Sequence, residues 1–229
     1  MTAFFVTATG TGVGKTLITA ALAYQLRRRG RPVRALKPLI SGFDEKGPSD
    51  THDLLAAQSL DTQGLPATDF DAISPWRFKA PLSPDMAAIR ENRTVPYDDL
   101  LDFCRNAMTK TDQTLLIEGV GGAFVPLDKD HLVADWIGDL GLPSLLVTGS
   151  YLGSLSHCLS TVEAMHARNL GLHAVVVSES DNAPVPLSET AATLARHLPD
   201  LAVVTLPRLA DRAEPAWSRA PDLIEALGL

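Results

Sequence analysis

The residues best suited to chemistry lie near the N-terminus, where an apolar run from Phe4 leads into the glycine-rich stretch 9–16, TGTGVGKT. Glycines let successive backbone N–H groups approach phosphate oxygens, and a helix that starts there adds its positive dipole end. Lys15 and Thr16 stand where a phosphate loop places a lysine for the β- and γ-phosphates and a hydroxyl for Mg²⁺. The stretch therefore predicts a nucleotide-binding P-loop.

The match to the strict pattern G-x-x-x-x-G-K-[ST] fails at one position, because Thr9 occupies the place of the first glycine and Gly10 comes one residue late. Two alternatives remain open on the residues alone. A glycine-rich turn beside a surface lysine needs no ligand. A dinucleotide fingerprint needs G-x-G-x-x-G without Lys-Thr, which makes it the weaker match.

A second candidate motif is the apolar run Leu115–Ile117, which ends in Glu118 and is followed by Gly119-Val120-Gly121-Gly122. A buried strand that ends in a carboxylate delivers that group to the ligand-binding edge of a parallel sheet. Mg²⁺ takes oxygen ligands, usually one or two carboxylates together with phosphates and water. Glu118 is therefore a predicted metal ligand, although many exposed strands also end in an acid.

Lys37 ends the predicted strand 33–36 and should lie at the same edge. By itself it is equally a lysine whose stem lies along apolar surface. Asp53 lies near the start of a predicted helix, where an acid is favoured by the dipole. It is also a candidate for the second carboxylate of the metal.

These residues need a sheet to bring them together, and the chain alternates apolar strands with amphipathic helices. Strands without internal polar alternation predict a parallel sheet covered on both faces, which is an α/β, P-loop-type doubly wound fold. No repeat or linker is evident, so we expect one domain over residues 1–229. Residues 41–49 read as a loop, and residues 61–84 are left largely unassigned. The expected strands are 33–36, 114–117, 144–147, 173–177 and 202–206, and the expected helices are 16–29, 50–58, 84–91, 96–108, 133–140, 154–168, 187–197 and 221–227.

Composition excludes several classes of protein. The net charge of −7 disfavours nucleic acid as the main partner. No apolar run approaches the roughly 20 residues of a membrane span, and no basic leader precedes the first strand. The two cysteines, Cys104 and Cys158, lack metal or redox spacing and indicate free thiols. We therefore expect a cytoplasmic location.

In combination, the segments resemble the dethiobiotin synthetase family over residues 2 to about 214. The resemblance is carried in family order by the P-loop with Thr9 in its first position, Lys37-Pro38-x-x-Ser41-Gly42, the Asp53 helix, Pro81-x-Ser83-Pro84, Glu118-Gly119-x-Gly121-Gly122 with Pro126-Leu127, and Leu152-Gly153-x-x-Ser156-His157.

The resemblance implies an ATP- and Mg²⁺-dependent ring closure of 7,8-diaminononanoate with CO₂ in biotin synthesis, carried out by a homodimer. Lys37 and Lys15 would be the catalytic residues, and Thr16, Asp53 and Glu118 would hold the metal. The implied ATP-binding residues are Gly12, Val13, Gly14, Lys15, Thr16, Leu17, Asp53, Glu118, Gly119, Val120, Gly121, Ser178, Glu179, Pro207, Arg208, Leu209 and Glu214. The implied substrate-binding residues are Thr11, Lys37, Ser41, Gly153, Ser154, Leu155 and Ser156.

The chain departs from the family pattern in two places. Gly12 stands where the family often has an acid, and Ser178-Glu179 stands where the family reads adenine with Asn-Asp. Because a serine pairs with adenine less completely than an amide does, we expect weaker base discrimination. A partition-type ATPase is the alternative, but such proteins usually have a lysine at the place of Gly10. A related corrinoid amide ligase normally needs an extra glutaminase domain.

Overall fold

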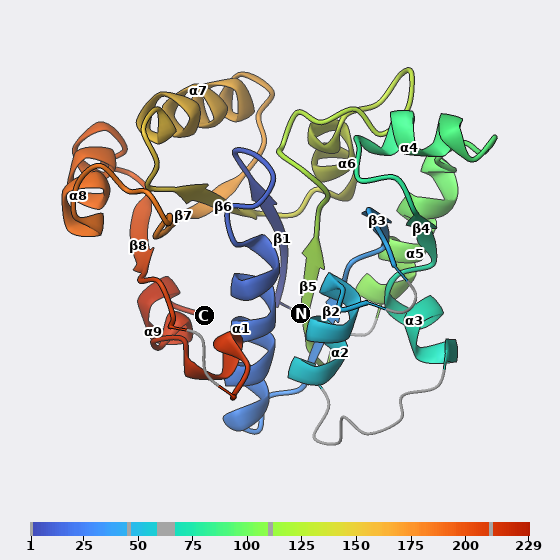
Figure 1. Cartoon of the computed structure of the whole chain (residues 1–229), viewed down its shortest axis with the longest axis horizontal. Helices are drawn as coiled ribbons and strands as arrows, with labels where there is room; N and C mark the ends of the chain where they lie inside the picture. Colours follow the sequence, from blue (N-terminus) through green and yellow to red (C-terminus); the bar gives the residue numbers. More distant parts are fainter. Residues whose placement is uncertain (1, 45–46, 59–66, 110–111, 211–212) are drawn as a thin grey trace.

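The structure is a computed structural model that describes residues 2–44, 47–58, 67–109, 112–210 and 213–229. Its centre is a six-stranded parallel sheet in the order β2-β5-β1-β6-β7-β8 (Figure 1). The strands are β1 Thr2–Ala8, β2 Val33–Leu36, β5 Thr114–Glu118, β6 Ser144–Gly149, β7 Leu172–Ser178 and β8 Ala202–Leu206. The expected doubly wound P-loop-type sheet is confirmed.

Helices cover both faces of this sheet (Figure 1). On one face lie α1 Lys15–Arg28, α2 Asp50–Gln58, α9 Leu223–Leu227 and the short 3-10 helix η1 Ala216–Arg219. The other face carries α5 Tyr97–Met108, α6 Val133–Leu140, α7 Ser154–Ala167 and α8 Leu187–His197. Because both faces are covered, β5 and β6 are buried along their whole length, and their apolar runs show no polar alternation.

A smaller unit stands beside the β2 edge. It consists of the two-stranded parallel sheet of β3 Leu39–Ser41 and β4 Trp76–Phe78, with α3 Ala67–Ile73 before β4 and α4 Pro84–Arg90 after it. Sequence reasoning left residues 61–84 largely unassigned, of which 61–66 lie outside the described residues. Strands of three residues are too short to show a period, which is why β3 and β4 escaped detection.

The predicted boundaries agree with the observed elements to within about two residues. Helix α9 shows the full two-residue difference, because it begins at Leu223, where Asp222 caps it by accepting the Glu225 N–H at 3.0 Å. Among the described residues, no helix is long and apolar enough to cross a bilayer. Cys104 and Cys158 are free and buried, as expected.

Candidate functional site

The central strand β1 lies between β5 and β6, so the loop that follows it opens at the carboxyl edge of the sheet, at the upper end of α1 in Figure 1. Gly12 and Gly14 have φ values of +73° and +96°, which side-chain-bearing residues rarely adopt. Gly14 is the N-cap of α1 and no side chain caps this end, so its N–H groups remain available to a ligand. The geometry is that of the predicted phosphate loop.

Beside this loop lies a cavity of ≈ 760 Å³. Its walls come from the P-loop, the start of α2, the end of β3, the turn before α4 and the loop after β5. It brings together ten of the predicted site residues: Thr11, Gly12, Gly14, Lys15, Thr16, Leu17, Lys37, Ser41, Val120 and Gly121. Asp50 and the segment 81–84 also line it, and neither was among the predicted site residues.

Three residues that line this cavity, Thr16, Lys37 and Asp50, belong to a cluster of charged and polar side chains that also includes Glu118. The Lys37 ammonium contacts Glu118 Oε1 and Asp50 Oδ2, each at 2.5 Å. Thr16 donates its hydroxyl to the same Glu118 oxygen at 2.7 Å. Glu118 is fully buried and Lys37 only 4% exposed, so these charges act with little screening by water.

The two lysines differ in their electrostatic setting. Burial lowers the pKa of Lys15 to about 8, since its only described partner is the Gly10 carbonyl at 3.1 Å. Burial also disfavours the Lys37 ammonium, but the carboxylates of Glu118 and Asp50 outweigh it and raise the pKa of Lys37. Lys37 is therefore a fixed cation at neutral pH, and the lowered pKa of Lys15 would rise again when an anion binds beside it.

The residues around Glu118 fit a divalent cation. Glu118 Oε2 is buried and has no hydrogen-bond partner among the described residues, which leaves a hard oxygen without a donor. Asp50 and the Thr16 hydroxyl adjoin the same ion cluster. Within the described ranges, no three His, Cys, Asp or Glu side chains form a complete cage. The set matches a Mg²⁺ that also needs phosphate oxygens.

The structure places Asp53 differently from the prediction. Its carboxylate accepts the Trp217 indole N–H at 3.4 Å, and it does not line the cavity. Asp50, three residues earlier on the first turn of α2, points at Lys37 instead. Both acids fit a helix start, and the local pattern does not show which faces the sheet. The acid of α2 beside Lys37 is therefore Asp50, and the geometry gives no support to the metal role predicted for Asp53.

A second cavity of ≈ 390 Å³ adjoins the first and shares Gly12, Gly14 and Leu17 with it. It is lined by the P-loop together with the ends of β7 and β8. The predicted nucleotide residues found here are Gly12, Val13, Gly14, Leu17, Ser178, Glu179, Pro207, Arg208 and Leu209. Tyr151, Asp181 and Asn182 were not foreseen.

Other predicted residues stand apart from both cavities. Glu214 is exposed and lines neither. Residues 153–156 form the start of α7, with Gly153 at φ +101° as its N-cap, and they also line neither cavity. Gly119 lies against the ring of Phe5, so an added Cβ would stand 2.8 Å from Phe5 Cε1. It serves close packing of the loop.

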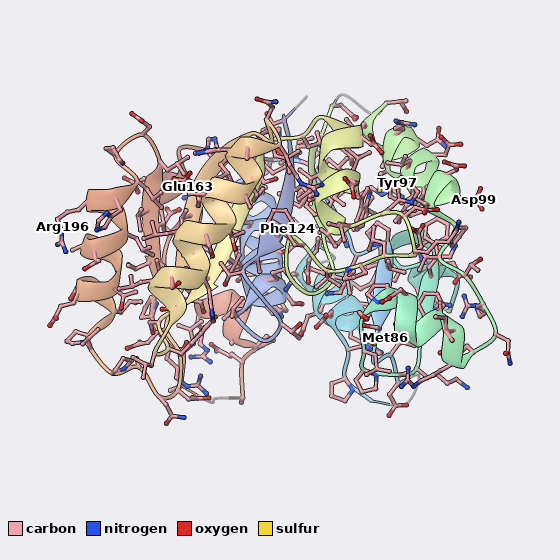
Figure 2. All side chains as sticks on the ribbon, turned by 90° about the horizontal axis from the view of Figure 1, so that it is seen from above. Met86, Tyr97, Asp99, Phe124, Glu163 and Arg196 are labelled. Carbon is pink, nitrogen blue, oxygen red and sulfur yellow. The ribbon has the colours of Figure 1, made fainter. Side chains whose placement is uncertain are left out.

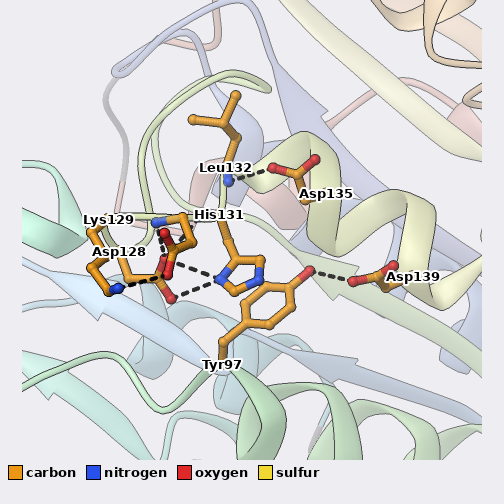
Figure 3. A network of polar contacts seen from close by, with 8 residues as sticks. Tyr97, Asp128, Lys129, His131, Leu132, Asp135 and Asp139 are labelled. Atoms are coloured by element: carbon orange, nitrogen blue, oxygen red, sulfur yellow. Dashed lines mark hydrogen bonds and ion pairs between the residues drawn. The ribbon is translucent and has the colours of Figure 1, made fainter.

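The loop after β5 is held by a polar network at its far end (Figure 3). Asp128 accepts the backbone N–H groups of Asp130 and His131 at 2.8 and 2.7 Å and contacts the His131 ring. That ring stacks on Tyr97, with centroids 3.8 Å apart, and Tyr97 donates to Asp139 at 2.8 Å. The network ties the loop that carries Val120 and Val125 to α5 and α6.

Comparison with known proteins places this geometry in a family. A family model described as an AAA domain matches residues 2–216. The chain is 48% identical over 204 residues to the ATP-dependent dethiobiotin synthetase of Methylobacterium nodulans, covering 86% of this chain and 89% of that protein. The same enzyme from Cellvibrio japonicus is 36% identical over 98% of this chain and 97% of its own length.

This chain belongs to the dethiobiotin synthetase family. The resemblance inferred from the sequence is confirmed, and with it the class of ATP-dependent ligase. Among solved structures, the MinC:MinD complex of Aquifex aeolicus matches with a TM-score of 0.55 at 12% identity, covering 96% of this chain and 86% of that one. A ParA-family ATPase from Chlorobium tepidum matches at 0.50 and 15%, covering 92% and 84%. At such identities the likeness shows the fold alone, so it gives no support to a partition ATPase.

Proposed function

We propose that this chain closes the ureido ring of dethiobiotin from 7,8-diaminononanoate, CO₂ and ATP. The observation that carries the proposal is the convergence of Lys15 and Lys37 on one cavity wall, beside the orphaned oxygen of Glu118. Two ammonium groups and a P-loop suit a triphosphate. The turn 81–84 and Ser41 line the same cavity of ≈ 760 Å³, which has room for a second, organic substrate.

The chemistry proceeds in three steps. One amine of the substrate adds to CO₂ and loses a proton, which gives a carbamate. A carbamate oxygen attacks the γ-phosphorus and ADP leaves, which gives a carbamic–phosphoric anhydride. The second amine attacks the carbamate carbon, and phosphate departs as the ring closes. Without phosphorylation the carbamate oxygen would be a poor leaving group, which explains the use of ATP.

The protein's part is positioning and charge neutralisation, which dominate phosphoryl transfer. Lys37 holds the carbamate and the transferring phosphoryl group, because its raised pKa keeps it cationic. Lys15 and the P-loop amides hold the β- and γ-phosphates. Thr11 and Ser41, which both line the cavity, hydrogen-bond the reacting end of the substrate.

For the metal we propose Mg²⁺ held by Thr16, Asp50 and Glu118 together with ATP. The support is the orphaned Glu118 oxygen and the hard-oxygen chemistry of all three groups. When bound, Mg²⁺ would neutralise charge on the phosphates. Lys37 would then exchange part of its contact with Glu118 and Asp50 for the substrate's anionic groups.

We further propose a cytoplasmic homodimer in which residues 153–156 bind the distal carboxylate of the substrate held by the second copy. A helix N-terminus with free N–H groups suits a carboxylate, and α7 offers one away from its own cavity. Leu152 beside it is 86% exposed, and on α4 Met86 and Ile89 are 51% and 71% exposed. Figure 2 shows Met86 on α4 among the other side chains. The free thiols support the location.

The deciding experiment is ATP turnover by the purified protein, with and without 7,8-diaminononanoate and bicarbonate. The expected result is phosphate release that needs both compounds, with dethiobiotin formed in equal amount. Hydrolysis that ignores both compounds would indicate a nucleotide switch and would overturn the proposal. Light scattering of the same sample measures the oligomer.

A further inference from the structure

The second cavity holds the part of the nucleotide that differs between ATP and other triphosphates. It shares Gly12, Gly14 and Leu17 with the phosphate cavity, so a triphosphate on the P-loop extends its base into this space. The groups that could read a base edge come from the ends of β7 and β8. The hydrogen bonds and ion pairs that these groups already make decide which of them can contact a base.

The two serines of this cavity differ in their contacts. Ser178 Oγ lies 2.9 Å from the point where a Cβ on Gly14 would stand, so this serine packs closely against the P-loop. Ser180 and Ser150 exchange two hydrogen bonds, N–H to Oγ in each direction, at 3.0 and 2.9 Å. Ser180 is therefore engaged, whereas contact of Ser178 with the base stays a prediction that the Ser178→Asn variant tests.

The acidic residues are engaged to different degrees. Asp181 pairs with the Arg208 guanidinium at 2.5 Å. Glu179 accepts the Arg208 backbone N–H through Oε2 at 2.8 Å, and its Oε1 has no partner among the described residues. Glu179 thus stays anchored at the mouth of the cavity while it offers an acceptor to a ligand.

A carboxylate accepts hydrogen bonds and donates none. Adenine and cytosine each present an amino group beside a ring nitrogen acceptor, so a carboxylate facing that edge gains one bond and opposes one lone pair. Guanine presents N1–H and N2–H₂ side by side, and both can donate to one carboxylate. The Arg208 guanidinium, on the same wall, is the group that pairs best with guanine O6 and N7.

We propose that Glu179 is a specificity-determining residue that opens this site to guanine nucleotides, so that GTP serves as a phosphoryl donor beside ATP. The inference rests on the proposed function, because it concerns the nucleotide used in that reaction. An adenine pocket that uses an amide side chain offers the base both a donor and an acceptor. The Glu179 carboxylate offers only an acceptor.

The test compares kcat/KM for ATP, GTP and CTP in dethiobiotin formation, together with equilibrium binding of each nucleotide with Mg²⁺ alone. In the unmodified protein, GTP should act within about tenfold of ATP and better than CTP. Glu179→Gln keeps an acceptor for the Arg208 N–H and adds a donor. It should lower the GTP-to-ATP ratio about tenfold or more, the usual discrimination of a two-bond base contact.

Two control variants sharpen the result. Asp181→Asn changes an acid whose described partner is Arg208 and should shift the ratio much less than Glu179→Gln. Ser178→Asn should weaken all three nucleotides alike, because the larger side chain displaces Gly14. A preference that sharpens for ATP alone in Ser178→Asn would assign the reading to Ser178 and overturn the proposal.

Strict use of ATP by the unmodified protein overturns the inference and leaves the proposed function standing. So does a GTP-to-ATP ratio that is unchanged in Glu179→Gln. If no triphosphate supports dethiobiotin formation, the proposed function fails. The binding measurements then judge Glu179 separately, through the affinities for GTP and ATP in the two proteins.

Discussion

The two cavities of the proposed nucleotide site differ in how far their charged side chains are exposed to water. We call the cavity that contains Lys15 and Lys37 the phosphate end, and the cavity at the ends of β7 and β8 the base end. At the phosphate end, Lys15, Lys37 and Glu118 are buried, and each charge contacts another group of the protein. At the base end, the side chains of Arg208 and Asp181 are 58% and 64% exposed. Buried charges interact strongly, whereas exposed pairs are screened and contribute little. Affinity should therefore reside in the phosphate end, and base choice should be set by a few weak contacts.

The largest effect should follow removal of Lys37. Lys37→Ala should lower kcat by about 10²–10³, as expected for loss of a charge aimed at the transferring group. It should also lower the free energy of unfolding by about 3 kcal/mol, because the fully buried Glu118 and the partly exposed Asp50 lose their shared cation. Kinetics and thermal unfolding measure the two effects.

Lys15→Ala is the matched comparison. It should lose activity to a similar degree while unfolding close to the unmodified protein, because the Lys15 ammonium contacts only the Gly10 carbonyl among the described residues. Equal destabilisation by the two variants would show that the Glu118–Lys37–Asp50 cluster is not the special feature of the phosphate end. Near-normal activity of Lys37→Ala would remove its catalytic role.

A smaller effect separates the two acids of α2. Asp50→Asn should raise the Mg²⁺ concentration needed for half-maximal activity by about tenfold or more, since a hard-oxygen ligand loses its charge. Asp53→Asn should leave that concentration nearly unchanged, because Asp53 contacts Trp217 and lies outside the cavity. The measurement is a Mg²⁺ titration at saturating ATP. The reverse outcome would restore Asp53 to the metal site.

The contrast between the two ends also explains what could be predicted from the sequence. The P-loop, Lys37 and Glu118 were found because strand ends, glycines and fixed spacings place them at one edge of a parallel sheet. The alternation of apolar strands and amphipathic helices follows the same logic, and the predicted element boundaries agreed with the structure to within about two residues. The residues of the phosphate end can thus be predicted from local sequence patterns.

The remaining features of the site depend on the directions of individual side chains. The spacing of apolar residues along the sequence does not reveal these directions. The first turn of α2 offers two acids, and only the packed rotation of the helix turns Asp50 toward Lys37. Ser178 lines the second cavity as expected, and the local pattern did not show that it also packs closely against Gly14. Strand β3, which brings Ser41 to the cavity, and its partner β4 are too short to show alternation. These features arise from tertiary contacts.

The smallest effect is expected at the turn 128–131, where a half-exposed ion pair behaves like the base end. Asp128 and the His131 ring are in contact at 2.9 Å, with side chains 20% and 36% exposed (Figure 3). The hydrogen bond with Asp128 raises the pKa of His131. Burial alone would raise the pKa of Asp128, but bonds from His131 and the turn N–H groups lower it.

The sign of the pH dependence follows from these directions. A histidine whose pKa is higher in the folded state stabilises the fold below its unfolded pKa, and this contribution is lost as the pH rises through the folded value. An acid with a lowered pKa contributes above its unfolded value and loses the contribution as the pH falls. The pair is therefore fully formed between about pH 4 and pH 6.5, the two unfolded values.

Asp128→Asn should accordingly lower the melting temperature by a few degrees near pH 6 and by less at pH 8.5. Some loss should persist at high pH, because an asparagine oxygen accepts the turn N–H bonds from Asp130 and His131 less strongly than a carboxylate does. His131→Phe keeps the stack on Tyr97 without the charge and should show no such pH dependence. Thermal unfolding of the three proteins across this range provides the measurement. A difference between Asp128→Asn and the unmodified protein that stays the same from pH 6 to pH 8.5 would show that backbone capping by Asp128, and not its pairing with His131, holds the loop behind Val120 and Val125.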